Sequence, residues 1–214
     1  MAENSIVIED VVKKFKDTMV LNHVSISFEK GKIHGIIGRN GSGKTVLFKS
    51  ICGFILLTSG KIIVNGQIIG KDIDIPKNIG AIIEAPGFLP GYSGYSNLKF
   101  LAMINRKISD KQIKETMIRV GLEPDSKKWV SKYSLGMRQR LGIAQAIMEN
   151  PDILILDEPM NGLDNEGVED IRNLLLNLKK EGKTILIASH SSEDIDILCD
   201  TVHEMDGGSV QTVR

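Results

Sequence analysis

The chain has 214 residues, 42% of them hydrophobic and 25% charged, which suits one compact domain or one domain with an inserted lobe. Its 27 basic and 27 acidic residues cancel, and zero net charge argues against a sequence-independent grip on nucleic acid or anionic lipid. Two distant cysteines argue against a disulfide framework. The first residues do not resemble a signal peptide, and no apolar run approaches the roughly 20 residues that cross a bilayer. We therefore expect a soluble protein that reaches a membrane only through a partner and binds no nucleic acid.

The first third of the chain is rich in strand patterns. Branched or alternating apolar segments predict strands over residues 5–12, 20–28, 32–37 and 61–64. The pair Asn65-Gly66, between 62–64 and 67–69, is a strong hairpin signal. A β-rich beginning is therefore expected.

The middle third has helical spacing instead. Helices are predicted over residues 97–105, 110–120 and 137–148. Ser96 is the expected cap of the first, and Ser109 or Asp110 of the second, which Gly121 ends. These segments predict a helical lobe.

The last third returns to strand and helix alternation. Residues 153–156 and 184–188 are short, wholly apolar runs of the kind found in strands buried on both faces. Residues 166–180 form an amphipathic helical pattern closed by Gly182. The order β-rich, helical, then α/β indicates a helical lobe inserted within an α/β core.

The most specific pattern is a phosphate loop. It reads Gly38-Arg39-Asn40-Gly41-Ser42-Gly43-Lys44-Thr45, followed by Val46. A predicted strand precedes it and a helix-compatible segment follows, so backbone N–H groups and the positive helix end point at one place. We predict that residues 38–46 bind a nucleoside triphosphate, with Lys44 reaching the terminal phosphates and Thr45 ligating Mg²⁺.

Two acids follow the buried strand at 153–156. A parallel strand would deliver Asp157 to the carboxyl edge of the sheet, beside the phosphate loop, where it can hold Mg²⁺. Glu158 would then face the γ-phosphate and could polarise an attacking water as general base. A solvated acidic turn is the alternative, which the phosphate loop disfavours.

With these motifs the chain resembles the ATP-binding cassette (ABC) ATPases over nearly its whole length. The family's signature, commonly Leu-Ser-Gly-Gly-Gln, corresponds to Tyr133-Ser134-Leu135-Gly136-Met137, before Asp157. The resemblance implies that two cassettes pack head to tail and that Ser134 and Gly136 close on the ATP of the second subunit. A Ser hydroxyl and amides at a helix start suit a γ-phosphate, although an ordinary Ser-capped helix has the same local pattern.

Other family positions match as well. Asn161-Gly162-Leu163-Asp164 resembles the D-loop, which crosses the dimer interface, and His190 resembles the switch histidine that contacts the γ-phosphate. Phe15 matches the aromatic position, usually Tyr, on which adenine stacks; a core or rim Phe is the alternative. The resemblance thus implies catalytic roles for Glu158, His190 and Lys44.

Two positions depart from the common family pattern. Glu84 stands where the family usually has a Gln that touches Mg²⁺ and signals to the transport partner; a carboxylate can still bind the metal, and an exposed loop acid is the alternative. Leu135 and Met137 replace the first Gly and the Gln of the signature. This combination is similar to the bacitracin-resistance and lantibiotic-immunity branch of ABC exporters.

The resemblance implies an α/β fold: a P-loop NTPase (RecA-like) core with an N-terminal antiparallel β subdomain and an inserted helical subdomain. The expected division of this single domain is 1–85 and 151–214 for the core with its β subdomain, and 86–150 for the helical signature subdomain. Residues 87–92 would lie at a groove for membrane subunits, and Tyr92, Tyr95 and Trp129 would pack the lobe or face a partner.

The resemblance implies an ATP-hydrolysing subunit that powers the export of a compound, such as a peptide antibiotic, by integral-membrane subunits. Asp157, Thr45 and Glu84 are the predicted metal ligands, and the location is cytoplasmic, on the inner face of the membrane. A regulatory ABC protein with little turnover is the main alternative. ABC ATPases of translation or DNA maintenance usually carry fused cassettes or extensions, which this sequence does not show, so that function is disfavoured. A small-molecule kinase is disfavoured by Ser134, Asp164 and His190.

Overall fold

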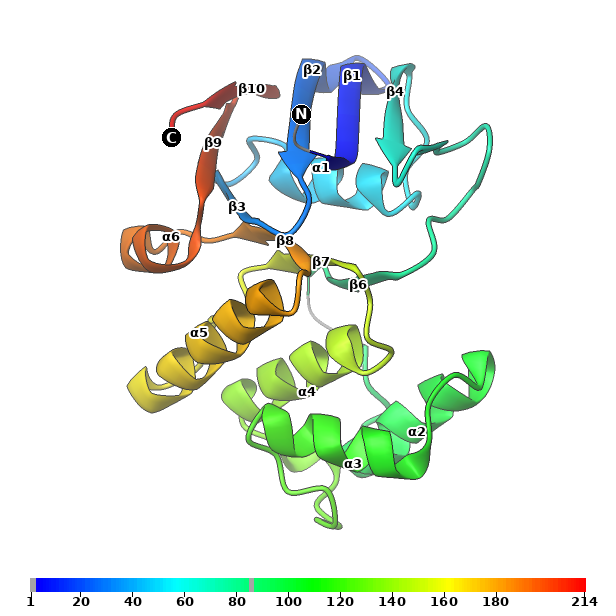
Figure 1. Cartoon of the computed structure of the whole chain (residues 1–214), viewed down its shortest axis with the longest axis vertical. Coiled ribbons are helices and arrows are strands. Elements are labelled where there is room, and N and C mark those ends of the chain that lie inside the picture. Colours follow the sequence, from blue (N-terminus) through cyan, green and yellow to red (C-terminus); the bar gives the residue numbers. More distant parts are fainter. Residues whose placement is uncertain (1–2, 85–86) are drawn as a thin grey trace.

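The computed structural model describes residues 3–84 and 87–214 and contains two sheets (Figure 1). The smaller sheet is antiparallel, in the order β2-β1-β4-β5. Its strands are β1 (Asn4–Phe15), β2 (Thr18–Glu29), β4 (Ser59–Val64) and β5 (Gln67–Ile68). The predicted hairpin is confirmed, because Val64 pairs with Gln67 across the Asn65-Gly66 turn.

The larger sheet has the order β10-β9-β3-β8-β7-β6, and only β10 runs antiparallel to its neighbour. Its strands are β3 (Ile33–Ile37), β6 (Ile79–Ile82), β7 (Ile153–Asp157), β8 (Thr184–Ala188), β9 (Thr201–Asp206) and β10 (Ser209–Thr212). The sequence patterns predicted β3, β7 and β8 but not β6, β9 or β10. Because β3, β8 and β7 are adjacent and parallel, the loops after them meet at one edge of the sheet.

Six α-helices accompany the sheets within the described residues. They are α1 (Lys44–Ile51), α2 (Gly94–Asn105), α3 (Asp110–Arg119), α4 (Leu135–Ile147), α5 (Asn165–Lys180) and α6 (Ser192–Leu198). In Figure 1, α1 lies between the two sheets, whereas α2, α3 and α4 pack together at the opposite end of the molecule. A single 3₁₀ turn, Val130–Lys132, precedes α4.

Two apolar cores flank the larger sheet. One contains Ile153 and Ile155 of β7 with Leu47 and Phe48 of α1, and it faces the smaller sheet. The other contains Leu154 and Leu156 with side chains of α2, α3, α4 and α5. The alternation along β7 shows why residues 153–156 are apolar throughout: each face of the strand is buried in a different core.

The helix caps partly correct the sequence prediction. Ser109 caps α3 in a capping box with Gln112, which decides between Ser109 and Asp110. Ser96 was expected to cap α2, but Ser93 does so, and its hydroxyl accepts the Ser96 amide at 3.2 Å. The prediction was wrong because Ser93 also fits a cap and the helix begins one turn earlier. The predicted subdomain boundary at residues 85 and 86 lies outside the described residues.

Candidate active site

The loop between β3 and α1 forms a phosphate-sized cradle. Gly43, the residue before α1, has φ of 109°, a conformation that side-chain-bearing residues rarely adopt. No side chain caps α1, so the first amides of the helix lack a side-chain acceptor. A helix start of this kind favours an anion through both its N–H groups and its dipole.

Lys44 is the buried cation of this cradle, with 7% of its surface exposed. Its Nζ donates to the carbonyl oxygens of Gly38 at 2.5 Å and Arg39 at 3.0 Å. Burial lowers the pKa of Lys44, and the charges of Asp157 and Glu158 partly offset this. The loop thus holds the ammonium by neutral acceptors, which a phosphate oxygen can replace.

Asp157 and Thr45 meet across the sheet edge as predicted. Asp157 is the last residue of β7, and its Oδ2 accepts a hydrogen bond from Thr45 Oγ1 at 2.9 Å. A carboxylate and a hydroxyl are hard oxygen ligands that suit Mg²⁺. The pair therefore fits a magnesium ion, which would take the place of the direct hydrogen bond.

Glu158 is held in an unusual backbone conformation, with φ of 51°. Its N–H donates to Ala188 O at 2.9 Å, which ties the end of β7 to β8. Its Oε1 is buried and has no hydrogen-bond partner among the described residues. Burial, together with the charge of Asp157, raises the pKa of Glu158, against opposing effects of His190 and Lys44. A half-buried carboxylate with a raised pKa and a free oxygen is suited to proton transfer.

His190 follows β8 and completes the group. Its Nε2 lies 3.1 Å from Asn40 Oδ1 and 3.3 Å from Glu158 Oε1. The first contact has hydrogen-bond geometry, whereas the second is a close approach without it. The imidazole therefore lies between the phosphate loop and Glu158. Its implied contact with the γ-phosphate remains a prediction.

These side chains line one cavity of about 470 Å³. Of the predicted site residues, the cavity includes Asn40, Gly41, Ser42, Gly43, Lys44, Thr45, Val46, Glu84, Asp157, Glu158 and His190. It also includes Val20, Leu135, Gln139 and Asn161, which the sequence analysis did not assign to the subunit's own site. Leu135 and Gln139 lie one helical turn apart on α4, a spacing that places them on one face.

Five predicted residues lie outside the lining of this cavity: Phe15, Gly38, Arg39, Ser134 and Gly136. Phe15 ends β1 with 44% of its surface exposed, and Lys13 Nζ lies 4.6 Å from its ring centroid. Ser134 caps α4, its hydroxyl accepting the Met137 amide at 3.1 Å, so the ordinary capping role is present. Their predicted nucleotide contacts therefore remain predictions.

Glu84 is at the rim of the cavity and is paired. Its Oε1 accepts a hydrogen bond from Lys49 Nζ of α1 at 2.8 Å, and 63% of its side chain is exposed. Its φ of 63° is again in the left-handed region. Lys49 is a neighbour that the sequence analysis did not identify.

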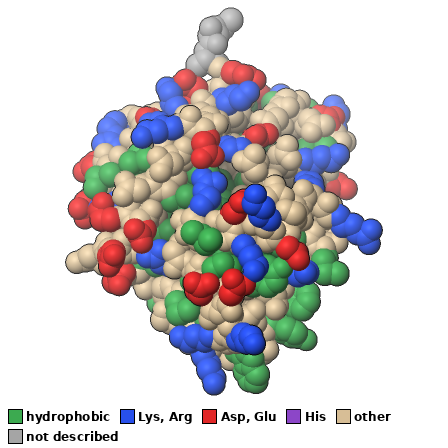
Figure 2. All heavy atoms as spheres, turned by 60° about the horizontal axis from the view of Figure 1, so that its bottom comes forward, with side chains coloured by type: hydrophobic (Ala, Val, Ile, Leu, Met, Phe, Trp, Pro, Cys, Tyr) green, Lys and Arg blue, Asp and Glu red, His purple; other side chains and the backbone are tan. Residues whose placement is uncertain are grey.

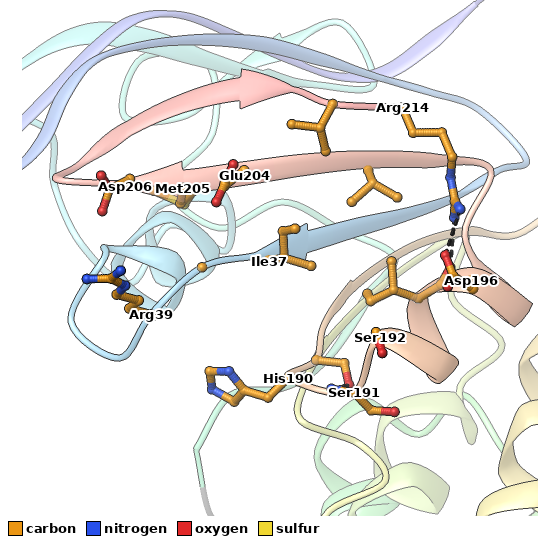
Figure 3. A pocket seen from close by; sticks show the side chains of 15 residues that line it. Ile37, Arg39, His190, Ser191, Ser192, Asp196, Glu204, Met205, Asp206 and Arg214 are labelled. Atoms are coloured by element: carbon orange, nitrogen blue, oxygen red, sulfur yellow. Dashed lines mark hydrogen bonds and ion pairs between the residues drawn. The ribbon is translucent and has the colours of Figure 1, made fainter.

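A second cavity, of about 630 Å³, shares His190 with the first (Figure 3). Its lining includes Arg39 and His190 at one end and the Arg214–Asp196 ion pair, at 2.9 Å, at the other. Lys44, Thr45 and the two acids do not line it. The smaller cavity therefore holds the residues suited to phosphate chemistry.

Comparisons with known proteins agree with this geometry. The family described as "ABC transporter" matches residues 21–161. The chain is 49% identical to the uncharacterized ABC transporter ATP-binding protein YybJ of Bacillus subtilis (strain 168), over 95% of this chain and 93% of that protein. It is 41% identical to the bacitracin transport ATP-binding protein BcrA of Enterococcus faecalis, over 94% of this chain and 66% of BcrA.

A lantibiotic transport ATP-binding protein, SrtF of Streptococcus pyogenes, is 38% identical over 91% of this chain and 84% of its own length. A solved nucleotide-free cassette of an ABC transporter has a TM-score of 0.87 and 25% identity, covering 99% of this chain and 92% of that one. The predicted P-loop NTPase fold is thereby confirmed. The chain belongs to the ABC transporter family and is an ATP-binding, ATP-hydrolysing subunit of such a transporter.

Proposed function

We propose that this subunit hydrolyses Mg²⁺-ATP in the 470 Å³ cavity and works as a head-to-tail dimer under membrane subunits that export a compound of the peptide-antibiotic class. One observation carries the catalytic part: a phosphate loop, an Asp–Thr pair, a half-buried carboxylate and a histidine converge on one cavity. The names of BcrA and SrtF support the substrate class.

In this proposal residues 38–46 bind the phosphates of ATP. Lys44 exchanges its carbonyl acceptors, Gly38 and Arg39, for phosphate oxygens, and the α1 amides add further hydrogen bonds. Thr45 and Asp157 hold Mg²⁺, with Glu84 at the rim. When bound, Mg²⁺ supplies neutralisation of the charge on the phosphates. Phe15 offers its ring to adenine once Lys13 has moved aside.

Glu158 is the proposed general base. Its unpaired Oε1 can accept the proton of an attacking water, and its raised pKa improves its strength as a base. His190 Nε2, which contacts Asn40 Oδ1, would exchange that acceptor for a γ-phosphate oxygen and donate a hydrogen bond to it as charge develops there. Lys44, which also lines the cavity, adds electrostatic stabilisation.

The second half of the site is proposed to come from another subunit. Ser134 and Leu135 are exposed at the start of α4, and a helix start carrying a hydroxyl suits a γ-phosphate. The backbone amide of Gly136, in the first turn of α4, would make the same contact. The D-loop residue Asp164 caps α5 through the Gly167 amide at 3.0 Å, which rigidifies the segment expected at the dimer interface.

The helical end is the proposed contact with the membrane subunits, and residues 86–150 the proposed helical subdomain. Leu89, Tyr92, Phe100, Met103 and Ile104 are large apolar residues there, each at least 41% exposed. Figure 2 views this end and shows hydrophobic side chains at the surface beside basic ones. None of the described helices has the length and hydropathy that a membrane crossing requires. We place the subunit on the cytoplasmic face, attached through its partners.

Replacing Glu158 by Gln tests the proposed chemistry. The amide keeps the shape of the side chain but cannot take a proton, so steady-state ATP hydrolysis should fall by about two orders of magnitude or more. Binding of ATP should stay within about twofold, because the loop, Lys44 and the Thr45–Asp157 pair are untouched. Retained steady-state hydrolysis in Glu158→Gln would remove Glu158 as the base.

A further inference from the structure

The side chain of Gln139 reaches the catalytic loop from α4. Its Nε2 donates a hydrogen bond to the backbone oxygen of Glu158 at 3.1 Å, across a sequence distance of 19 residues. Gln139 also lines the 470 Å³ cavity. The proposed base is therefore contacted by the signature helix of its own subunit.

The contact is made to a residue whose backbone is in an unfavourable conformation, since Glu158 has a φ of 51°. A non-glycine residue in the left-handed region is destabilised and persists only where its surroundings fix it. The Glu158 oxygen accepts hydrogen bonds from Asn161 N at 3.1 Å and from Gln139 Nε2. The Glu158 N–H is held by Ala188 O of β8, and the Asn161 bond closes a local turn. Gln139 adds a contact to the Glu158 carbonyl from a helix.

The start of α4 lies tightly against the loop that follows Glu158. A Cβ on Gly136 would approach Gly162 O to 2.9 Å, and one on Gly162 would meet the Leu135 side chain at 2.4 Å. Because the helix and the loop are in such close contact, they have little room to move independently of each other. A rotation of α4 would therefore shift the Gln139 amide relative to the Glu158 carbonyl.

We infer that Gln139 is a positioning residue for hydrolysis: its amide holds the backbone of Glu158 so that the carboxylate faces the cavity of the same subunit. The inference rests on the proposed role of Glu158. It gives the signature helix a second task in addition to its proposed contact with the ATP of the partner. Through Gln139, the orientation of α4 sets the position of the base.

The test compares two replacements on α4. Gln139→Met keeps the length and removes the donor, while Gln145→Met makes the same chemical change at a half-buried position two turns along the helix. For Gln139→Met, kcat should fall about tenfold, a part of the 10²–10⁴-fold that a general base supplies, with KM for ATP within about twofold. Gln145→Met should retain wild-type kcat.

The comparison of kcat with KM distinguishes positioning from a loss of structure. A misplaced base should lower kcat in Gln139→Met while the intact phosphate loop keeps KM for ATP near the wild-type value, whereas damage to the fold should change both. If Gln139→Met unfolds early in a thermal scan, Gln139→Glu takes its place in the test. Gln139→Glu is isosteric with the wild type, also lacks the donor, and should show a similar loss of kcat.

Wild-type kcat in Gln139→Met, a rise in KM as large as the fall in kcat, or an equal loss of kcat in Gln145→Met would each overturn the inference. Failure of the proposed function gives a different result, because Glu158→Gln would then retain hydrolysis. If Glu158→Gln abolishes turnover while Gln139→Met retains it, Glu158 is still supported as the base and the positioning role of Gln139 is contradicted.

Discussion

At the scale of single residues, the charged side chains of the site are held by contacts with the phosphate loop and with neighbouring residues. Lys44 is bound to loop carbonyls, Asp157 to Thr45, and Glu84 to Lys49. Each of these contacts occupies a group that the proposed mechanism assigns to phosphate or metal. ATP and Mg²⁺ must therefore displace these contacts when they bind. The strength of the displaced contacts then lowers the apparent affinity for ATP and Mg²⁺.

The Glu84–Lys49 pair leads to a prediction about the dependence of hydrolysis on Mg²⁺. Glu84→Gln should raise the Mg²⁺ concentration for half-maximal hydrolysis, since an amide is a weaker ligand than a carboxylate, and leave basal hydrolysis within a few-fold. Lys49→Met should lower that concentration by up to about fivefold, because an exposed ion pair is worth roughly 0.2–1 kcal/mol.

Lys99→Met is the matched control for Lys49→Met, since it breaks another 2.8 Å pair, with Asp110, away from the cavity. The measurement is a Mg²⁺ titration of ATPase activity for the wild type and the three variants. If all four titrations superimpose, Glu84 is a bystander at the rim.

At the scale of elements, the strand order places the catalytic loops, and a polar network joins strands farther along the same sheet. His34 of β3 is within 2.7 Å of Thr201 Oγ1, which is 2.9 Å from His203 Nε2 of β9, and His203 Nδ1 is 3.0 Å from Thr212 of β10. Both histidines are buried, with 1% and 4% exposed. The network uses neutral imidazoles as both donors and acceptors.

The histidine network predicts a loss of stability on acidification. Burial lowers the pKa of His203 to about 4 and also lowers the pKa of His34. Between about pH 6.5 and 4 the unfolded chain therefore binds more protons than the folded one, so stability falls as the pH falls. The unfavourable protonation of His203 should lower the free energy of unfolding by about 2–3 kcal/mol at pH 4.

Urea unfolding between pH 7.5 and 4.5 measures this effect. In His203→Gln, which keeps hydrogen-bonding groups but does not titrate, the slope of the unfolding free energy against pH should be shallower than in the wild type. Equal slopes for the two proteins would mean that other groups govern acid stability.

At the scale of the whole molecule, the proposed site is incomplete in one chain. Ser134 is exposed and does not line the cavity of its own subunit, whereas Leu135 and Gln139 on the same helix do. One helix would therefore serve two sites, its cap facing a partner and its next turn supporting the internal base. Closure of two subunits would then complete both sites together.

This arrangement predicts that hydrolysis depends on protein concentration. Turnover per molecule should rise with concentration, because only the dimer completes a site, and Glu158→Gln with ATP should have twice the monomer mass in light scattering. Wild-type chain without nucleotide is the control and should scatter as a monomer. Hydrolysis strictly proportional to protein, with a mutant that stays monomeric, would contradict a self-pairing subunit.

The sequence by itself determined the phosphate loop, the buried strands β3, β7 and β8, the Asn65-Gly66 hairpin and the acidic pair after β7. These depend on local rules: glycine conformations, two-residue periodicity and motif spacing. Residue positions such as His190 were assigned through family resemblance, and β6, β9, β10 and α6 were not predicted, because short strands and helices carry weak periodic signals.

Only the tertiary structure decided which distant side chains meet. The order β3-β8-β7 brings His190 to 3.3 Å from Glu158, and the packing of α4 brings Gln139 to its backbone. Lys49 could not be identified as the partner of Glu84 from their spacing, since 35 residues separate them. Such pairs depend on strand order and helix packing, and the cores that set these are built from many apolar contacts that no local pattern specifies.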